Sequence, residues 1–218
     1  MKLLLSLILL FTCTFTYARD PLPGSRYESL SGIETSKEGK KSEKEKETKK
    51  IEGMDKTPSA FLANNFDYLP PGAHVLDLDM GDGRNAVFLA RKGFKVTGLE
   101  DNEEVYKNAK ILAKEVGVRI DAILGDRSTH QFPHQSFDVI MSFHHVDKKI
   151  IDRIKNWLRP GGFIIYEAIT EQELNVPKGE LSVKSGELLN LFGDYRILKY
   201  EEPIHRKEFK ASIILKKE

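Results

Sequence analysis

Two glycines and several acidic residues share one short stretch of the chain, VLDLDMGDGRNA, at residues 75–86. Gly81 and Gly83 permit a backbone path and a close ligand approach that a Cβ atom would block. A helix that begins directly after the second glycine points unpaired N–H groups toward the same place. The stretch therefore predicts a ligand-binding turn between a strand and a helix.

Glu100 adds a second polar group to this turn. It follows Gly81 by nineteen residues, at the end of the next expected strand. A carboxylate there can accept hydrogen bonds from both hydroxyls of a ribose. Gly81, Gly83, Ala86 and Glu100 together satisfy the fingerprint of a dinucleotide site, although short glycine patterns also recur by chance as plain turns.

The charge of the stretch distinguishes between ligand classes. Asp77 lies on the strand that leads into the turn, where a pyrophosphate site has little use for a carboxylate. A sulfonium or an ammonium group, in contrast, favours nearby negative charge. With Asp79, Asp82 and Glu100 the crevice is acidic. These residues therefore favour S-adenosylmethionine as the ligand, with a nicotinamide dinucleotide as the alternative.

The segment around the turn alternates between strands and helices. Strands are expected at 74–78, 94–99, 118–124, 137–143 and 162–166, with β-like runs at 195–200 and 210–215; helices are expected at 85–92, 102–116, 148–158 and 185–192. This alternation predicts one doubly wound α/β domain, a mostly parallel sheet with helices on both faces. In such sheets the ligand binds beyond the carboxyl ends of the strands, where the strand order reverses. The glycine turn is expected at that edge.

The first 56 residues differ in composition from the rest. Lys2 precedes an apolar run at 3–11 and a small residue, Ala18, ends a cleavage pattern, so residues 1–18 are predicted to be an export signal. Residues 19–56 are predicted to be a charged flexible linker, because 36–50 holds seven lysines, four glutamates and no hydrophobic residue. The protein is then periplasmic or secreted if the signal is cleaved, and tethered to the membrane by its N-terminus otherwise.

Overall charge and length narrow the function classes further. Among 218 residues, 34 lysines and arginines nearly balance 33 aspartates and glutamates, which gives a formal net charge of +1. This balance argues against a protein held to nucleic acid or to an anionic membrane by charge alone. Once residues 1–18 are removed, no stable membrane span is expected. A domain over 57–218 is long enough to bury a core of its own.

Cysteine and histidine usage argues against metal and thiol chemistry. Cys13 is the single cysteine and lies in the predicted signal, so disulfides, cysteine-based zinc sites and thiol catalysis are excluded from the domain. His130, His134, His144 and His145 lack a clearly placed carboxylate that would complete a metal site. No metal centre is therefore predicted.

Four segments of the chain resemble one protein family. The segments that carry the resemblance are LPPG at 69–72, residues 75–100 from the glycine turn to Glu100, SFDVIMSF at 136–143 and LRPGGFIIYEA at 158–168. Together they resemble the class I S-adenosylmethionine-dependent methyltransferases. More narrowly, the chain is similar to the small tellurite-resistance and thiopurine-type members, which carry GRN after the glycine turn. The resemblance extends from about Thr57 to Lys217.

The resemblance implies a Rossmann-like sheet of seven strands whose last strand is antiparallel, with S-adenosylmethionine over the ends of the first four strands. It also implies roles for single residues. Asp77, Gly81 and Gly83 would form the methionine-binding turn, Glu100 would hold the ribose, Asp126 and Arg127 would lie near the adenine, and Ser142 would line the wall toward the acceptor.

The resemblance leaves the roles of Asp79 and His145 open. The family usually has Gly or Ala where this chain has Asp79, because the backbone crowds the cofactor there; its carboxylate either pairs with the cofactor's ammonium group or obstructs the pocket. His145, after the fourth strand, is the expected general base if the acceptor has to lose a proton. A polar loop is the alternative interpretation of His145.

Three functions are compatible with these observations. The first is methyl transfer to a small-molecule acceptor, because the domain carries no large substrate-recognition insertion. The second is an exported, non-catalytic binding protein, which Asp79 and the export signal favour because the methyl donor is made in the cytosol. The third is a nucleotide-dependent oxidoreductase, which Asp77 disfavours. Fold alone does not choose among them.

Overall fold

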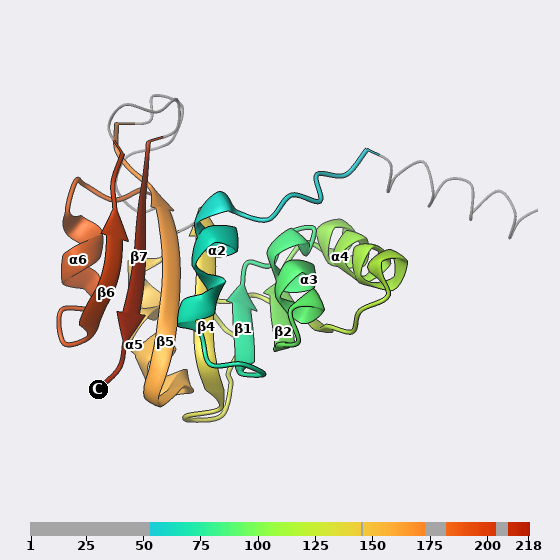
Figure 1. Cartoon of the computed structure of the whole chain (residues 1–218), viewed down its shortest axis with the longest axis horizontal. Coiled ribbons are helices and arrows are strands. Elements are labelled where there is room, and N and C mark those ends of the chain that lie inside the picture. The colour runs from blue at the N-terminus through green and yellow to red at the C-terminus, as the bar shows by residue number, and fades with distance from the viewer. Residues whose placement is uncertain (1–52, 145, 173–181, 204–208) are drawn as a thin grey trace, which may run out of the picture. The chain divides into compact units, whose positions relative to one another are not determined.

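The computed structural model describes residues 53–144, 146–172, 182–203 and 209–218 (Figure 1). These residues form a seven-stranded sheet with the strand order β3-β2-β1-β4-β5-β7-β6. The strands are β1 (His74–Leu78), β2 (Lys95–Glu100), β3 (Asp121–Leu124), β4 (Phe137–His144), β5 (Leu158–Ile169), β6 (Arg196–Glu201) and β7 (Lys210–Lys216).

Strand direction follows the predicted pattern. The pairs β1–β2, β1–β4, β2–β3 and β4–β5 are parallel, and β7 runs antiparallel to both of its neighbours, β5 and β6. The strand order reverses at β1, which pairs with β2 on one side and β4 on the other. The expected doubly wound, Rossmann-like sheet with an antiparallel last strand is thus confirmed, and the glycine turn follows the strand at the reversal point.

The helices divide between the two faces of the sheet (Figure 1). They are α2 (Ala60–Asn65), α3 (Arg84–Arg91), α4 (Glu103–Val116), α5 (Ile151–Trp157) and α6 (Glu187–Leu191). Alternate residues of a strand point to opposite faces of the sheet. On one face, Leu76 packs in a cluster with residues of α5 and α6. Val75 packs in a second cluster with residues of α2, α3 and α4. Burial on both faces explains why the central strands are almost continuously apolar.

Two strands begin three or more residues away from their expected starts. The strand expected at 118–124 is β3, which begins only at Asp121. Gly117 ends α4 in a left-handed conformation, and the N–H of Val118 donates to the carbonyl of Ala113, so the next residues complete the helix end instead of the sheet. The strand expected at 162–166 begins at Leu158, which already pairs with Phe137 of β4.

Within the described ranges, no helix is long and apolar enough to cross a membrane. The predicted export signal at 1–18 and most of the predicted linker lie outside the described residues, so both remain predictions.

Candidate functional site

Asp77 is a buried acid at the carboxyl edge of the sheet. Its side chain is 1% exposed, and within the described part of the chain its Oδ2 atom has no hydrogen-bond partner. Burial raises the pKa of this carboxyl well above its usual range, and the negative charges of Asp79 and Glu100 raise it further. An orphaned buried acid of this kind requires an explanation, and a polar or cationic ligand is one.

Glu100 ends β2 and braces the glycine turn. One carboxylate oxygen accepts a 2.9 Å hydrogen bond from the N–H of Gly81, and the other accepts a 3.0 Å bond from the N–H of Asn102. Each oxygen retains a second lone pair, so Glu100 can still accept from a ligand hydroxyl. A Cβ atom added to Gly81 would meet no atom within 4 Å, so the space above the turn is open.

Gly83 begins α3 and has a packing role in the same turn. Its φ of 82° is in the left-handed region. A Cβ atom there would lie 2.8 Å from the Cβ of Ala109 in α4. Only glycine therefore fits this position without a shift of one helix against the other.

The side chain of Asp79 connects the end of β1 with the loop that follows β3. Its φ of 58° is left-handed, which is uncommon for a residue with a side chain. Its carboxylate forms an ion pair with the guanidinium of Arg127, which follows β3. Burial opposes protonation of Arg127, and the Asp79 carboxylate more than compensates, so that the pKa of Arg127 is raised.

Arg127 belongs to a loop whose backbone carbonyls accept hydrogen bonds from α5. Nη1 of Arg153, on α5, donates to the carbonyl oxygens of Arg127 (3.0 Å) and Ser128 (2.5 Å). The neighbouring carboxylate of Asp126 accepts from the N–H and the hydroxyl of Ser128. Asp126 is thus engaged in its own turn, while Arg127 extends toward Asp79.

Ser142 on β4 and Tyr166 on β5 lie side by side near the carboxyl ends of these strands. They are register partners across the two strands, and their side chains share a hydrogen bond. Burial raises the pKa of the Tyr166 phenol to about 12, and the charges of Asp79 and Arg127 also act on it. Of the predicted cofactor residues, Asp77, Asp79, Glu100, Arg127 and Ser142 therefore lie near one another at the carboxyl edge of the sheet.

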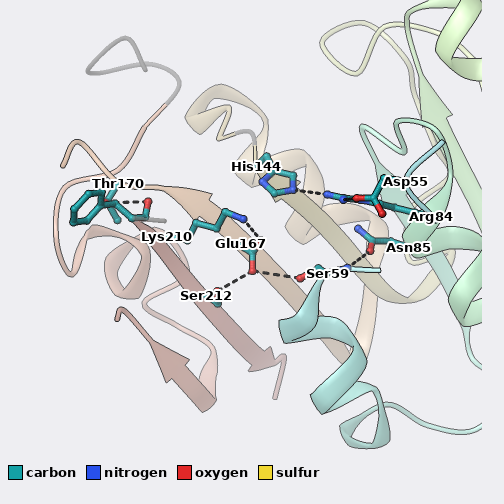
Figure 2. Close-up of polar contacts among 10 residues, drawn as sticks. Asp55, Ser59, Arg84, Asn85, His144, Glu167, Thr170, Lys210 and Ser212 are labelled. Atoms are coloured by element: carbon teal, nitrogen blue, oxygen red, sulfur yellow. Dashed lines mark hydrogen bonds and ion pairs between the residues drawn. The ribbon is translucent and has the colours of Figure 1, made fainter. Parts of the chain in front are cut away.

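A cleft of about 420 Å³ lies next to this crevice. Its lining comes from the segment before α2, from the start of α3, and from β4, β5, β6 and β7, and includes Asp55, Ser59, Arg84, His144, Glu167, Lys199, Lys210 and Ser212. Figure 2 shows most of these side chains and their polar contacts.

Arg84 links the glycine turn to the cleft. Its Nη1 atom donates to Oδ2 of Asp55 at 2.8 Å, and its Nη2 atom lies 3.0 Å from Nε2 of His144 (Figure 2). A guanidinium can only donate, so Nε2 accepts and the ring is neutral with its proton on Nδ1. The φ of His144 is 72°, a left-handed value that turns the chain at the end of β4.

Glu167 is the buried carboxylate of the cleft. Its side chain accepts from the hydroxyls of Ser59 (3.4 Å) and Ser212 (3.2 Å), and Nζ of Lys210 lies 3.6 Å away (Figure 2). The N–H of Ser59 donates to Oδ1 of Asn85 at 2.8 Å. Glu167 and Asn85 thus fix the start of α2 over the carboxyl ends of the strands.

None of the residues that line this cleft was among the site residues predicted from the sequence. Asp55, Ser59, Lys210 and Ser212 come from segments far from the glycine turn, and only the strand order brings them together. Arg84 and Asn85 were visible as the residues after the second glycine, but nothing in the sequence indicates their partners. The predicted base, His145, lies outside the described residues. Among the residues that the structure does describe, no group of three or more histidines, cysteines or acids could hold a metal ion.

Comparison with known proteins identifies relatives of the central part of the chain. Residues 75–162 match the family model of a methyltransferase domain. The ubiquinone biosynthesis O-methyltransferase of Shewanella pealeana is 29% identical over 104 residues, which cover 45% of this chain and 44% of that protein. The 2-methyl-6-phytyl-1,4-hydroquinone methyltransferase of Synechocystis is 33% identical over 106 residues, which cover 46% of this chain and 33% of that protein. The match spans less than half the length of these relatives.

Solved structures share the fold over more of the chain. TehB from Haemophilus influenzae aligns with a TM-score of 0.61 at 22% identity, over 72% of this chain and 61% of that one. An S-adenosylmethionine-dependent methyltransferase from Methanosarcina mazei aligns with a TM-score of 0.60 at 19% identity, over 74% of this chain and 98% of that one. At these identities the likeness establishes the fold.

Proposed function

We propose that this chain is a class I S-adenosylmethionine-dependent methyltransferase that transfers a methyl group from S-adenosylmethionine to a small polar acceptor; its residues 75–162 match the model of a methyltransferase domain, and it shares its fold with solved S-adenosylmethionine-dependent methyltransferases. The observation that carries the proposal is the orphaned, buried carboxyl of Asp77 beside an open glycine turn and next to a polar cleft. The turn suits the cofactor, and the cleft suits the acceptor.

The residues present fit this cofactor. Open space above Gly81 allows a ligand to approach the backbone. Glu100 retains lone pairs for ribose hydroxyls, and Asp77, Asp79 and Glu100 supply the negative charge that a sulfonium and an ammonium favour. A diphosphate would meet the same three carboxylates, which disfavours the nicotinamide alternative.

The size and lining of the cleft support a small polar acceptor. A volume of about 420 Å³ is within the range of small-molecule sites. Three cationic side chains line it, and each is paired: Arg84 with Asp55, Lys210 with Glu167, and Lys199 with Glu201. The relatives named above are an O-methyltransferase of ubiquinone biosynthesis and a methyltransferase of a phytyl hydroquinone, and a hydroxyl group is a feature that a lining of this kind can bind.

These contacts suggest a role in methyl transfer for each of the named residues. S-adenosylmethionine supplies a methyl group on a good leaving group, so little covalent help from the protein is needed. Glu167 and His144 hold polar groups of the acceptor, and Arg84 fixes the His144 ring. Ser142 and Tyr166 are buried and hydrogen-bonded to each other near the carboxyl ends of β4 and β5. Alignment of the acceptor and exclusion of water are then the protein's main contributions.

A specific observation favours a second function. Asp79 already pairs with Arg127 across the crevice, an arrangement that suits a non-catalytic binding protein if the pair keeps the cofactor out. Export through the predicted signal would also separate the protein from its methyl donor. This alternative predicts neither cofactor binding nor product.

Methyl transfer can be tested directly. The purified full chain is incubated with methyl-labelled S-adenosylmethionine and a panel of small phenols, carboxylates, thiols and metalloid oxyanions, and labelled product is separated and counted. We expect label in at least one acceptor class, and at least a tenfold loss in Glu167→Gln, which removes the charge in the cleft. Glu103→Gln, at an exposed position on α4, is the matched control. Absence of both cofactor binding and labelled product with the folded chain would favour the second function.

A further inference from the structure

We propose that the Asp79–Arg127 ion pair is exchanged for the amino-acid group of the cofactor: Asp79 receives its ammonium, and Arg127 receives its carboxylate. The inference rests on the proposed function. It assigns a cofactor-recognition role to the residue that departs from the family pattern, and to a loop residue expected only near the adenine. The pair would then select a zwitterionic ligand.

Backbone conformation is the first support for this assignment. Asp79 has a φ of 58° directly after β1, a conformation that glycine adopts freely and other residues rarely do. Strain at such a position persists where the side chain is needed. The carboxylate of Asp79 reaches Arg127 from there, across the end of the intervening strand β2.

Location is the second support. Asp77 and Glu100, the two acids of the crevice, are close enough to Asp79 for their charges to act on one another. Asp147 and Tyr166, at the ends of β4 and β5, act on Arg127 in the same way. The ion pair therefore lies where the strand order reverses, in the crevice itself.

Charge balance is the third support. A cofactor with one ammonium and one carboxylate can replace each partner of the pair with a group of the same sign, so neither Asp79 nor Arg127 is left without a counter-charge. The two side chains are 23% and 21% exposed, and partly hydrated pairs of this kind contribute little to stability. Opening the pair is thus a small cost compared with two new charge-assisted contacts.

The exchange predicts how the full chain ranks three nucleosides in calorimetric titrations. S-adenosylmethionine carries both groups, its decarboxylated form carries the ammonium alone, and 5′-methylthioadenosine carries neither. We expect S-adenosylmethionine to bind at least tenfold more tightly than the decarboxylated form, which in turn binds more tightly than methylthioadenosine.

Two variants assign the preferences to the two residues. Arg127→Gln should bring the ratio between S-adenosylmethionine and its decarboxylated form close to one. Asp79→Asn, which tolerates the left-handed backbone, should reduce the advantage of the decarboxylated form over methylthioadenosine, and the part that remains reflects the sulfonium, which methylthioadenosine also lacks. Arg119→Gln, whose side chain is 92% exposed, is the matched control and should leave all ratios unchanged. Circular dichroism establishes that each variant is folded.

The outcomes separate this inference from the proposed function. If none of the three nucleosides binds the folded full chain, the proposed function itself fails. If all three bind with similar affinity, the cofactor site stands but the exchange is overturned. The exchange is also overturned if Arg127→Gln tightens all three equally, because the ion pair is then only an obstruction.

Discussion

A buried carboxyl oxygen without a hydrogen-bond partner among the described residues, Oδ2 of Asp77, is the chemical feature on which the cofactor assignment depends. Asp77 could have been a surface acid at the end of a strand, yet it is almost fully enclosed beneath the glycine turn. Its proton is held more tightly in the folded chain than in the unfolded one, because burial raises its pKa. The folded state therefore loses stability as pH rises from the ordinary carboxyl range through the folded pKa.

This linkage predicts the behaviour of Asp77→Asn. An amide carries no proton to lose, so the variant should be more stable than the original chain at pH 7, by about 1 kcal/mol or more. The gain should shrink as pH falls toward 4, because the folded carboxyl is then protonated and the unfolded one is about half protonated. Urea unfolding midpoints of both proteins at pH 4 and pH 7 measure it. An equal difference at the two pH values would contradict the raised pKa.

His144 allows a second prediction at this scale. Arg84 can only donate to Nε2, so the ring proton should be on Nδ1 at neutral pH. Heteronuclear NMR of the histidine rings in the full chain should show this tautomer, with His144→Gln used to assign the signal. In Arg84→Ala the preference should be lost. A proton on Nε2 of His144 in the original chain would contradict the contact.

At the scale of elements, the tightest constraint is the packing of α3 against α4 at Gly83. Gly83→Ala places a Cβ atom 2.8 Å from Ala109 and also strains a left-handed backbone. Gly93→Ala, at a φ of 90° in open space, incurs only the backbone strain and is the matched control. We expect Gly83→Ala to lower the free energy of unfolding by about 1–3 kcal/mol more than Gly93→Ala. Equal losses in chemical denaturation would show that the helices move apart freely.

The elements themselves were largely readable from the sequence. β1 matches its expected bounds, because HVLDL is an apolar run closed by a glycine turn. Asn102 marks the start of α4 by accepting from the N–H groups of Glu104 and Val105. What failed were boundaries set by tertiary pairing, such as the start of β5 at Leu158, which depends on its partner Phe137.

The candidate site was readable only in part, for a related reason. The cofactor side is encoded locally, since Asp77 lies in β1, Gly81 follows that strand and Glu100 ends β2, the next strand along the chain. The acceptor side depends on β7, which inserts between β5 and β6 and brings Ser212 beside Glu167. No local pattern records that insertion. The left-handed backbone of Asp79 and its pairing with Arg127 were likewise invisible in the sequence.

For the whole molecule, cofactor binding should appear as a gain in stability. A ligand that binds only the folded state at a hundred times its Kd stabilises that state by about 2.7 kcal/mol. For a chain of this size the expected rise in Tm is about 5–10 °C. Thermal unfolding of the full chain with and without S-adenosylmethionine measures it. An unchanged Tm at millimolar concentrations would count against the cofactor site.

The cofactor site is tested most directly by a calorimetric titration of the full chain with S-adenosylmethionine, repeated with Asp77→Ala and with the exposed control Asp67→Ala. We expect saturable binding with one cofactor per chain, loss of at least tenfold in affinity in Asp77→Ala, and no change in Asp67→Ala. Absence of binding by the folded original chain, or equal binding by Asp77→Ala, would contradict the assignment of this crevice as the cofactor site.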